Sequence, residues 1–562
     1  MRPNAKVDKW ASASTPAVTT AAHGPGDAQL QPLLPTESGL RDEDMTSLRP
    51  RAPYSDEELA KLYPSSVKLQ QVQVLLRHGE RSPVSARFQN AGLAPFWPYC
   101  SVARQILNAT LNSQSSQWGS LEWKRRLETF GPEDSPVIAS GPDGEVDTIC
   151  NLGELTDTGR RTTHALGKRL RHLYVDQLKF MPSTISDANS IYLRATPIPR
   201  ALESMQEAFW GLYPSDTRSA SFPPPTIITR NPSDETLFPN DGNCRRFAML
   251  SRAFAQRTAD RWNDTTEMAY VTKKIGKWMP DPSKGVAVDS RPRLSGIMDT
   301  INSTLAHGPE TLLPKEFYDN KGREIIDKIG VEEWFSGYKE SQEYRALGIG
   351  GLMGDICQRM VDHVERNGTS GGPATKGTDG EQDIRLGLSG CHDTTLAAIL
   401  TSLGAFDGEK WPPYTSHVAL ELFKQTDQPG RQVPSKDQIA PNTPQPVSQN
   451  SGKQSWFGWF SKEAANQNNS QASVSRKRIE ELSDTEKDKL DGYYVRVRYN
   501  DKPMYIPGCA LPGNHLDGDE SFCTLATFKA IVDKFTPKNW KQDCRSNLDA
   551  PSFPKATEAA GF

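Results

Sequence analysis

Three short apolar segments of this sequence end in side chains that can bind or attack a phosphate group. The first runs into "RHGERSP" at 77–83, the second into "RATP" at 194–197, and the third into "CHDTT" at 391–395. Guanidinium groups bind phosphate oxygens in pairs and keep their charge at any working pH. A neutral imidazole beside them can attack phosphorus. The candidate residues are Arg77, His78, Arg81, Arg194, His392 and Asp393.

These residue types are enough for hydrolysis of a phosphate ester. The leaving alkoxide needs a proton, and Asp393 is the carboxylate next to a candidate histidine. As a protonated acid it can give that proton, and it can then take one from the water that hydrolyses a phosphohistidine. The arginines supply the positive charge, so the scheme needs no metal and no other cofactor. The sequence has no HExxH pattern and no zinc-type spacing of cysteine and histidine.

Each candidate group stands where a strand pattern changes into a helix pattern. Alternation places Val72, Val74 and Leu76 on one face of a buried strand. A strand at 191–193 and a strand ending at Leu388 are each followed by apolar residues at helical spacing. The order of strand, charged turn and helix predicts an α/β sheet, in which ligands bind beyond the carboxyl ends of the strands.

Composition divides the chain into one large domain and less structured parts. We expect a disordered tail at 1–65, because it is polar and rich in proline. The main domain is predicted at 66–545, followed by a C-terminal tail at 546–562. Within the domain we expect a mostly helical cap lobe at about 245–380, a flexible loop at about 366–382 and a polar insertion at about 425–490.

The charge balance argues against some classes of partner. The 562 residues include 66 basic and 69 acidic side chains, so we expect neither nucleic acid nor an anionic membrane as the main partner. No apolar run is long enough to cross a bilayer, and we find no secretory signal peptide. We therefore expect an intracellular protein, cytoplasmic or mitochondrial, although the first residues fit a disordered tail as well as a targeting sequence. The eight cysteines are then expected to be free thiols.

Two further features allow two interpretations each. Cys391 is either a thiol whose oxidation inactivates the site or a small side chain packed at a strand end. The aromatic residues of "SWFGWFSK" either make a peripheral membrane contact or contact a partner, or else they fold back onto the sheet edge. They are Trp456, Phe457, Trp459 and Phe460.

Together, "RHGERSP" and "CHDTT" resemble the histidine acid phosphatase family, a branch of the histidine phosphatase superfamily with RHGxRxP and a later HD. The resemblance extends through "LGELTDTGRRTTHALGKRLR", "YLRATPIPRALES", "WPPYTSHVALELF" and "YYVRVRYNDKPMYIPGC", and so covers most of 67–545. Within the family, the sequence looks most like the lysophosphatidic acid phosphatase group. The resemblance implies a phosphoglycerate-mutase-like three-layer α/β core with a mixed central sheet and a smaller helical cap lobe.

The resemblance also implies a role for each site residue. The nucleophile falls on His78 and the proton donor on Asp393, while the phosphate clamp falls on Arg77, Arg81, Arg194 and His392. Relatives often read RSTDxxR where this chain has "RATPIPR", so Pro197 replaces a polar residue and Arg200 keeps its place, with a role that can be structural. Cys509 and Cys523 fall where secreted relatives form a disulfide, but we expect them to be reduced here.

We therefore expect an acid phosphatase that works through a phosphohistidine, acting on lysophosphatidate or another lipid phosphate. A phytase or sugar-phosphate phosphatase of the same family is the first alternative, although HD in place of HAE argues against phytate. A phosphomutase shares the arginines and the histidine, but the RxP extension and the HD pair favour hydrolysis. A non-catalytic interaction protein is disfavoured by the intact set of site residues.

Overall fold

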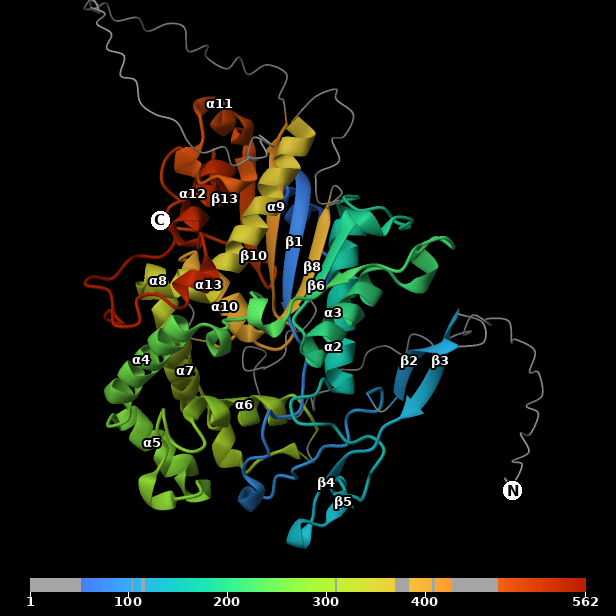
Figure 1. The fold of residues 1–562 in the computed structure, drawn as a ribbon, viewed down its shortest axis with the longest axis vertical. Coiled ribbons are helices and arrows are strands. Elements are labelled where there is room, and N and C mark those ends of the chain that lie inside the picture. Colours follow the sequence, from blue (N-terminus) through green and yellow to red (C-terminus); the bar gives the residue numbers. More distant parts are fainter. Residues whose placement is uncertain are drawn as a thin grey trace, which may run out of the picture. The chain divides into compact units, whose positions relative to one another are not determined.

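A mixed nine-stranded sheet carries the residues singled out in the sequence (Figure 1). Its strand order is β12-β13-β10-β9-β1-β8-β6-β7, with β11 paired to β10. β1 is parallel to β8, and β8 is parallel to β6, whereas β9 is antiparallel to both β1 and β10. The strands are β1 (Val67–Arg77), β6 (Ile191–Ala195), β7 (Ile227–Ile228), β8 (Leu386–Cys391), β9 (His417–Gln425), β10 (Tyr493–Tyr499), β11 (Lys502–Met504), β12 (His515–Leu516) and β13 (Asp519–Thr524).

The structure is a computed structural model. It describes residues 52–103, 105–112, 117–308, 311–368, 384–406, 410–426 and 474–562, which all belong to one compact unit, Met45–Phe562. The expected flexible loop at 366–382 and the aromatic segment at 455–462 lie largely or wholly outside these ranges. Among the helices described, none has the length and hydropathy needed to span a bilayer.

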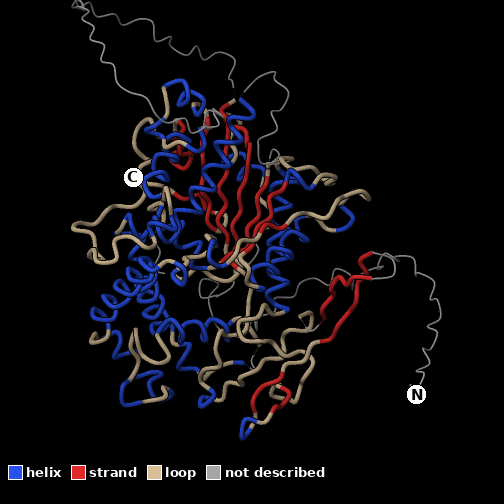
Figure 2. Tube along the Cα trace, viewed as in Figure 1, coloured by secondary structure: helices blue, strands red, loops and turns tan. Residues whose placement is uncertain are grey.

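The two faces of β1 explain the layers. Val72, Val74 and Leu76 pack against α2 (Asp157–Arg171) and α3 (Pro199–Leu212). Leu75 packs on the opposite face, among apolar residues of α9 (Gly351–Gly368), α10 (Asp393–Ser402) and α12 (Leu525–Phe535). Figure 2 shows the strands with helices on both sides. The predicted three-layer α/β core with a mixed sheet is confirmed, because helices pack on both faces of the sheet. Gln71 and Gln73 are buried on the face of Leu75 and donate hydrogen bonds to the carbonyl oxygens of Ile384 and Ile356.

Helices also fill the region where we predicted a cap lobe. They are α4 (Arg245–Trp262), α5 (Thr266–Ile275), α6 (Leu294–Leu305), α7 (Asn320–Glu340), α8 (Gln342–Arg345) and α9. Helices α5, α6 and α7 share an apolar cluster with the segment around Trp97, whereas α9 covers the sheet. The cap boundaries stay a prediction, but α9 packs with the core. Two hairpins precede α2: β2 (Gln105–Asn112) with β3 (Gln117–Lys124), and β4 (Glu128–Phe130) with β5 (Pro136–Ile138).

The bounds that we predicted for the two tails include residues that are folded. Order begins before residue 65, because Ser55 caps α1 (Asp56–Leu62) and the flanking tyrosines reach the sheet. At the other end, Arg345 donates a hydrogen bond to the Glu558 carbonyl, and Ala560 is buried. The polar composition of these segments gave no sign of these contacts. Residues 474–490, placed in the polar insertion, likewise bury Val474, Leu482 and Leu490; the segment includes α11 (Asp484–Lys487).

The cysteines contradict the expectation of free thiols. Disulfides join Cys100 to Cys150, Cys244 to Cys544, and Cys509 to Cys523, leaving Cys357 and Cys391 free. The second bridge ties the start of α4 to the end of α13 (Trp540–Asp543) across 300 residues of sequence. The family resemblance pointed to the pair Cys509 and Cys523, and our expectation that it is reduced is wrong. Sequence spacing gave no sign of the other two pairs, because folding alone brings their Cα atoms within bonding range.

A buried charge network holds the amino-terminal segment on the sheet. Glu421 of β9 is fully buried and accepts hydrogen bonds from Arg496 at 2.8 and 2.9 Å, while Arg498 lies 3.4 Å away. The hydroxyls of Tyr63 and Tyr174 donate to its other oxygen at 2.6 and 2.8 Å. Burial raises the pKa of Glu421, but the two arginines outweigh it and hold the pKa below its ordinary value. The carboxylate is therefore the common partner of four side chains.

Removing the charge of Glu421 should destabilise the fold. Glu421→Gln leaves two buried guanidiniums without a charged partner, so urea unfolding at pH 7 should show a loss of about 3–5 kcal/mol. The folded pKa lies below the unfolded one, so this stabilisation is present above the unfolded pKa and is lost as pH falls through the folded pKa. Asp147→Asn, in an exposed pair with Arg126, should cost less than about 1 kcal/mol. Equal losses in the two variants would contradict the role of the network.

Alkylation tests the disulfides. Unfolded without reductant, the protein should gain two alkyl groups by intact mass, on Cys357 and Cys391. After reduction it should gain eight, one for each cysteine. Eight groups under both conditions would restore the expectation of reduced thiols.

Candidate active site

The register of the parallel strands assembles the site. Arg77, the last residue of β1, pairs with Cys391, the last residue of β8. His78 and His392 therefore leave adjacent strands at the same level, and their rings lie 5.6 Å apart. Gly79 allows this turn to approach α2, because a Cβ there would lie 2.4 Å from the Gly159 carbonyl oxygen. The two predicted motifs thus form one site.

His78 is prepared to act as a nucleophile. Its Nδ1 lies 2.9 Å from the Gly79 carbonyl oxygen, which can only accept a hydrogen bond. Nδ1 therefore carries the hydrogen, and Nε2 keeps its lone pair. Burial, followed by the charges of Arg200, Arg81 and Arg77, holds the pKa of His78 well below its ordinary value. The imidazole stays neutral in acid, where an exposed histidine would be protonated.

Asp393 is held as a carboxylate in this structure. Its Oδ2 lies 2.8 Å from Nη2 of Arg77 and accepts a hydrogen bond of 2.9 Å from Nε1 of Trp411. Burial raises the pKa of Asp393, but Arg77 and Trp411 outweigh it and keep the pKa below its ordinary value. His392, which caps α10, lies 3.1 Å from the hydroxyl of Thr196 through Nε2. Burial and the charge of Arg200 lower the pKa of His392 to about 3.

An aromatic ring and a second carboxylate hold the arginines. The guanidiniums of Arg77 and Arg81 lie 4.1 and 5.8 Å from the ring centre of Tyr414. Arg77 also donates to the carbonyl oxygen of Pro412. Asp299 of α6 lies 2.8 Å from Nη1 of Arg81. Burial lowers the pKa of Arg81, but Asp299 raises it overall, so the guanidinium stays charged.

Arg194 does not lie in the site, contrary to the prediction. In the sheet it pairs with Ser389, two residues before the end of β8, so it lies deeper than Arg77. Its guanidinium is fully buried at 2.6 Å from Glu235 and 3.6 Å from Asp355. The largest charges that shift the pKa of the two site histidines are those of other residues, Arg200 first among the arginines. We had placed Arg194 at the strand end, and the register corrects this.

Arg200 takes the place that we had assigned to Arg194. It is the second residue of α3, and its charge is the largest of those that lower the pKa of both His78 and His392. Burial, and then repulsion by Arg81, lowers its own pKa to about 10. The sequence signal for the start of this helix was Pro199, its first residue, since proline is favoured at the first helical position.

Other site residues were missed because only the tertiary structure brings them here. Trp411 and Tyr414 belong to "WPPYTS", which the sequence showed only as part of a resemblance. Asp299 comes from the cap and gave no signal in the sequence. The described residues contain no cluster of three metal-ligating side chains.

The structure explains the acidic residue of "RHGERSP" and decides between the two interpretations of Cys391. Glu80 is fully buried and accepts a hydrogen bond from Thr162, whose hydroxyl also lies 3.0 Å from that of Thr415. Glu80 therefore stabilises the turn after Tyr414 through the hydroxyl of Thr162. Cys391 is fully buried, and burial raises the pKa of its thiol. The structure thus favours the packing interpretation over the reactive thiol.

Several known proteins are similar to this chain in sequence or in fold. The pattern of the histidine phosphatase superfamily (branch 2) matches residues 68–435. A probable acid phosphatase of Schizosaccharomyces pombe is 36% identical over 485 residues, which are 86% of this chain and 95% of that protein. Lysophosphatidic acid phosphatase type 6 of Bos taurus is 25% identical over 361 residues, 64% of this chain and 74% of that protein. The apo form of Hafnia alvei phytase has a TM-score of 0.48 at 13% identity, covering 86% and 99% of the two chains. The chain therefore belongs to branch 2 of the histidine phosphatase superfamily and is an acid phosphatase, a phosphoric monoester hydrolase.

Proposed function

We propose that the enzyme cleaves its substrate through a phosphohistidine on His78. The observation that carries the proposal is the state of this imidazole, which donates through Nδ1 to Gly79 and keeps Nε2 free. Attack by Nε2 forms the N–P bond as the ester P–O bond breaks, and water later cleaves the N–P bond to release phosphate. The low pKa of His78 keeps the nucleophile neutral in acid.

The charge that develops on phosphorus is stabilised by three guanidiniums. Arg77, Arg81 and Arg200 surround His78 and stay charged. His392 is neutral and acts as a hydrogen-bond partner for a phosphate oxygen. Arg194 is left out of this clamp.

Asp393 becomes the acid when substrate binds. In the free enzyme it is an ionised partner of Arg77. A bound phosphate competes for the same guanidinium and adds negative charge beside the carboxylate, and both effects raise its pKa. The protonated Asp393 then donates to the leaving oxygen, and its carboxylate accepts a proton from the attacking water.

Lysophosphatidate or another lipid phosphate is the substrate that we propose first. Its support is the name of the Bos taurus relative, at 25% identity. Inositol phosphates are the second candidate, suggested by the phytase names among the similar structures. The membrane contact through the aromatic segment at 455–462 remains a prediction. An intracellular location also remains one, and the three disulfides argue against it, since such bonds persist in oxidising compartments.

Variants of Arg200 and Arg194 should differ in the pH dependence of their activity. Arg200→Gln removes the largest charge acting on His78, so the pKa of the imidazole should rise. The acid limb of kcat/KM should then move to higher pH, with a fall in kcat of about 100-fold or more. Arg200→Lys keeps the charge and should leave the limb near its wild-type position. Arg194→Gln should destabilise the fold without moving the limb, and a shift in that variant would return Arg194 to the clamp.

The role of Asp393 depends on the leaving group. Asp393→Asn should slow hydrolysis of an alkyl phosphate by about 10²–10⁴-fold, but hydrolysis of p-nitrophenyl phosphate much less, because nitrophenolate leaves without a proton. Rapid quench with labelled substrate should trap phosphohistidine in this variant and none in His78→Ala. Equal losses with both substrates would remove Asp393 from the acid role.

A further inference from the structure

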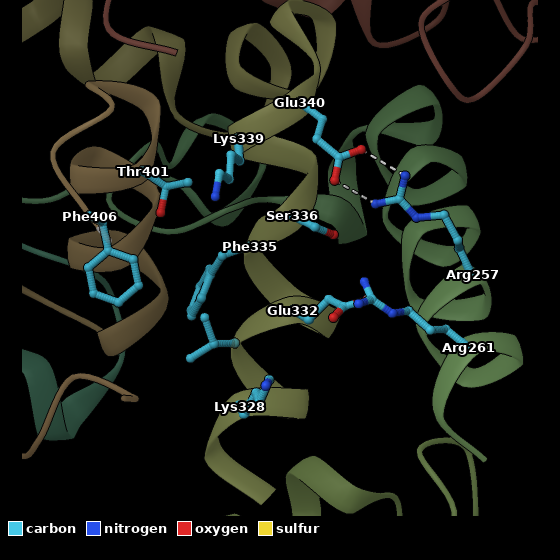
Figure 3. A pocket seen from close by; sticks show the side chains of 11 residues that line it. Arg257, Arg261, Lys328, Glu332, Phe335, Ser336, Lys339, Glu340, Thr401 and Phe406 are labelled. Atoms are coloured by element: carbon cyan, nitrogen blue, oxygen red, sulfur yellow. Dashed lines mark hydrogen bonds and ion pairs between the residues drawn. The ribbon is translucent and has the colours of Figure 1, made fainter. Parts of the chain in front are cut away.

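A second groove lies between three helices, apart from the residues around His78 (Figure 3). Its volume is about 570 Å³, within the range of small-molecule sites. One face of α7 forms the floor, α4 forms one wall, and the end of α10 with Phe406 forms the other. None of the site residues named above lines it.

The ion pairs of the groove leave positive charge in excess. Arg257 binds Glu340 through two contacts of 2.7 and 2.8 Å, and Arg261 lies 3.1 Å from Glu332. These are the carboxylates among the lining residues, and both are paired with arginines of α4. Lys339 is exposed and has no ion pair within the described residues. An anion can therefore bind at Lys339 without breaking an existing pair.

The rest of the lining is apolar, with two hydroxyl groups. Val331 and Phe406 are partly exposed and provide the apolar surface, whereas Phe335 is almost completely buried next to them. The hydroxyls of Ser336 and Thr401 are buried without a hydrogen-bond partner in the described part of the chain. Buried polar groups are nearly always hydrogen bonded, so these two can pair with oxygen atoms of a bound molecule. Lys328, the other lysine of the lining, lies 5.7 Å from the ring centre of Trp262. Apolar surface beside Lys339 suits a molecule with one charged head and an apolar chain.

We propose that this groove binds an amphiphilic monoanion such as a fatty acid. The carboxylate lies at Lys339, and the chain lies over Phe335 and Phe406. A multiply charged anion fits less well, because extra charges would have to displace Glu332 or Glu340 from its arginine. The groove is distinct from the phosphate clamp, because none of the clamp residues lines it.

The groove is connected to the active site through aromatic rings. Phe335 lies 6.4 Å from Phe406 and 5.0 Å from Trp411 between ring centres. Trp411 donates to Asp393, the acid that we assign to the reaction. A chain packed beside Phe335 therefore changes the hydrogen bond from Trp411, which, after the charge of Arg77, helps to keep the pKa of Asp393 low. This consequence rests on the proposed function, whereas binding does not.

Binding is tested with decanoate on full-length His78→Ala, by calorimetry with saturating inorganic phosphate to occupy the active site. We expect one decanoate per chain and an affinity at least tenfold lower in a second variant that also carries Lys339→Glu. Lys339→Arg should retain binding. Lys284→Glu makes the same charge change outside the groove and should have no effect. No binding, or equal binding after Lys339→Glu, would overturn the proposal.

The apolar part of the site is tested by chain length and by Phe406→Ala. Hexanoate should bind at least tenfold more weakly than decanoate, and Phe406→Ala should reduce this difference. Equal affinities for hexanoate and decanoate would show that the apolar chain does not contribute to binding, and would overturn the proposal of an amphiphilic ligand. In the active enzyme, decanoate should shift the pH dependence of kcat for an alkyl phosphate. In the Lys339→Glu variant of the active enzyme, decanoate should cause no such shift. If decanoate binds but the pH dependence does not shift, the link to Asp393 is wrong. If the protein shows no phosphatase activity at all, the calorimetry still shows whether the groove binds decanoate.

Discussion

The parallel pairing of β1 with β8 is the constraint on which the active site depends. Arg77 lies opposite Cys391 in this pairing, so the next residues of both strands emerge at one edge of the sheet. A shift of one residue would turn alternate side chains to the other face and separate His78 from His392. The apolar faces of β1 fix the register, because α2 and α3 on one side and α9 and α10 on the other both need it. Core packing thus positions the chemistry.

Placing so much positive charge at one point has a cost, and the fold offsets it in several ways. Asp393 and Asp299 each pair with one guanidinium, and the ring of Tyr414 faces two of them. The histidines stay neutral and so add no further repulsion. In the reaction that we propose, the same arrangement serves catalysis, because a phosphate dianion replaces the carboxylates as the counter-charge. The resting site is therefore a set of temporary partners for arginines that bind substrate.

The cap contributes to this balance from outside the sheet. Asp299 reaches Arg81 from α6, and α7 lies against Trp411, the hydrogen-bond donor to Asp393. Disulfides also link distant parts of the chain, and one joins the first cap helix to the carboxyl-terminal region. Phe335 of the groove on α7 lies 5.0 Å from Trp411 between ring centres, so an occupant of the groove would act on the side of the acid rather than on the nucleophile.

The sequence by itself determined the α/β layers, the strand ends and the two motifs with His78 and Asp393, because local periodicity and residue type decide them. Tertiary structure alone decided which arginine belongs to the clamp. Arg194 and Arg200 are both near a strand end in sequence, but the register of β6 places Arg194 below the edge and the start of α3 places Arg200 at it. Folding likewise decided the positions of Asp299 and Trp411, the disulfides and the contacts of the segments at 52–65 and 546–562, since these depend on residues distant in the sequence.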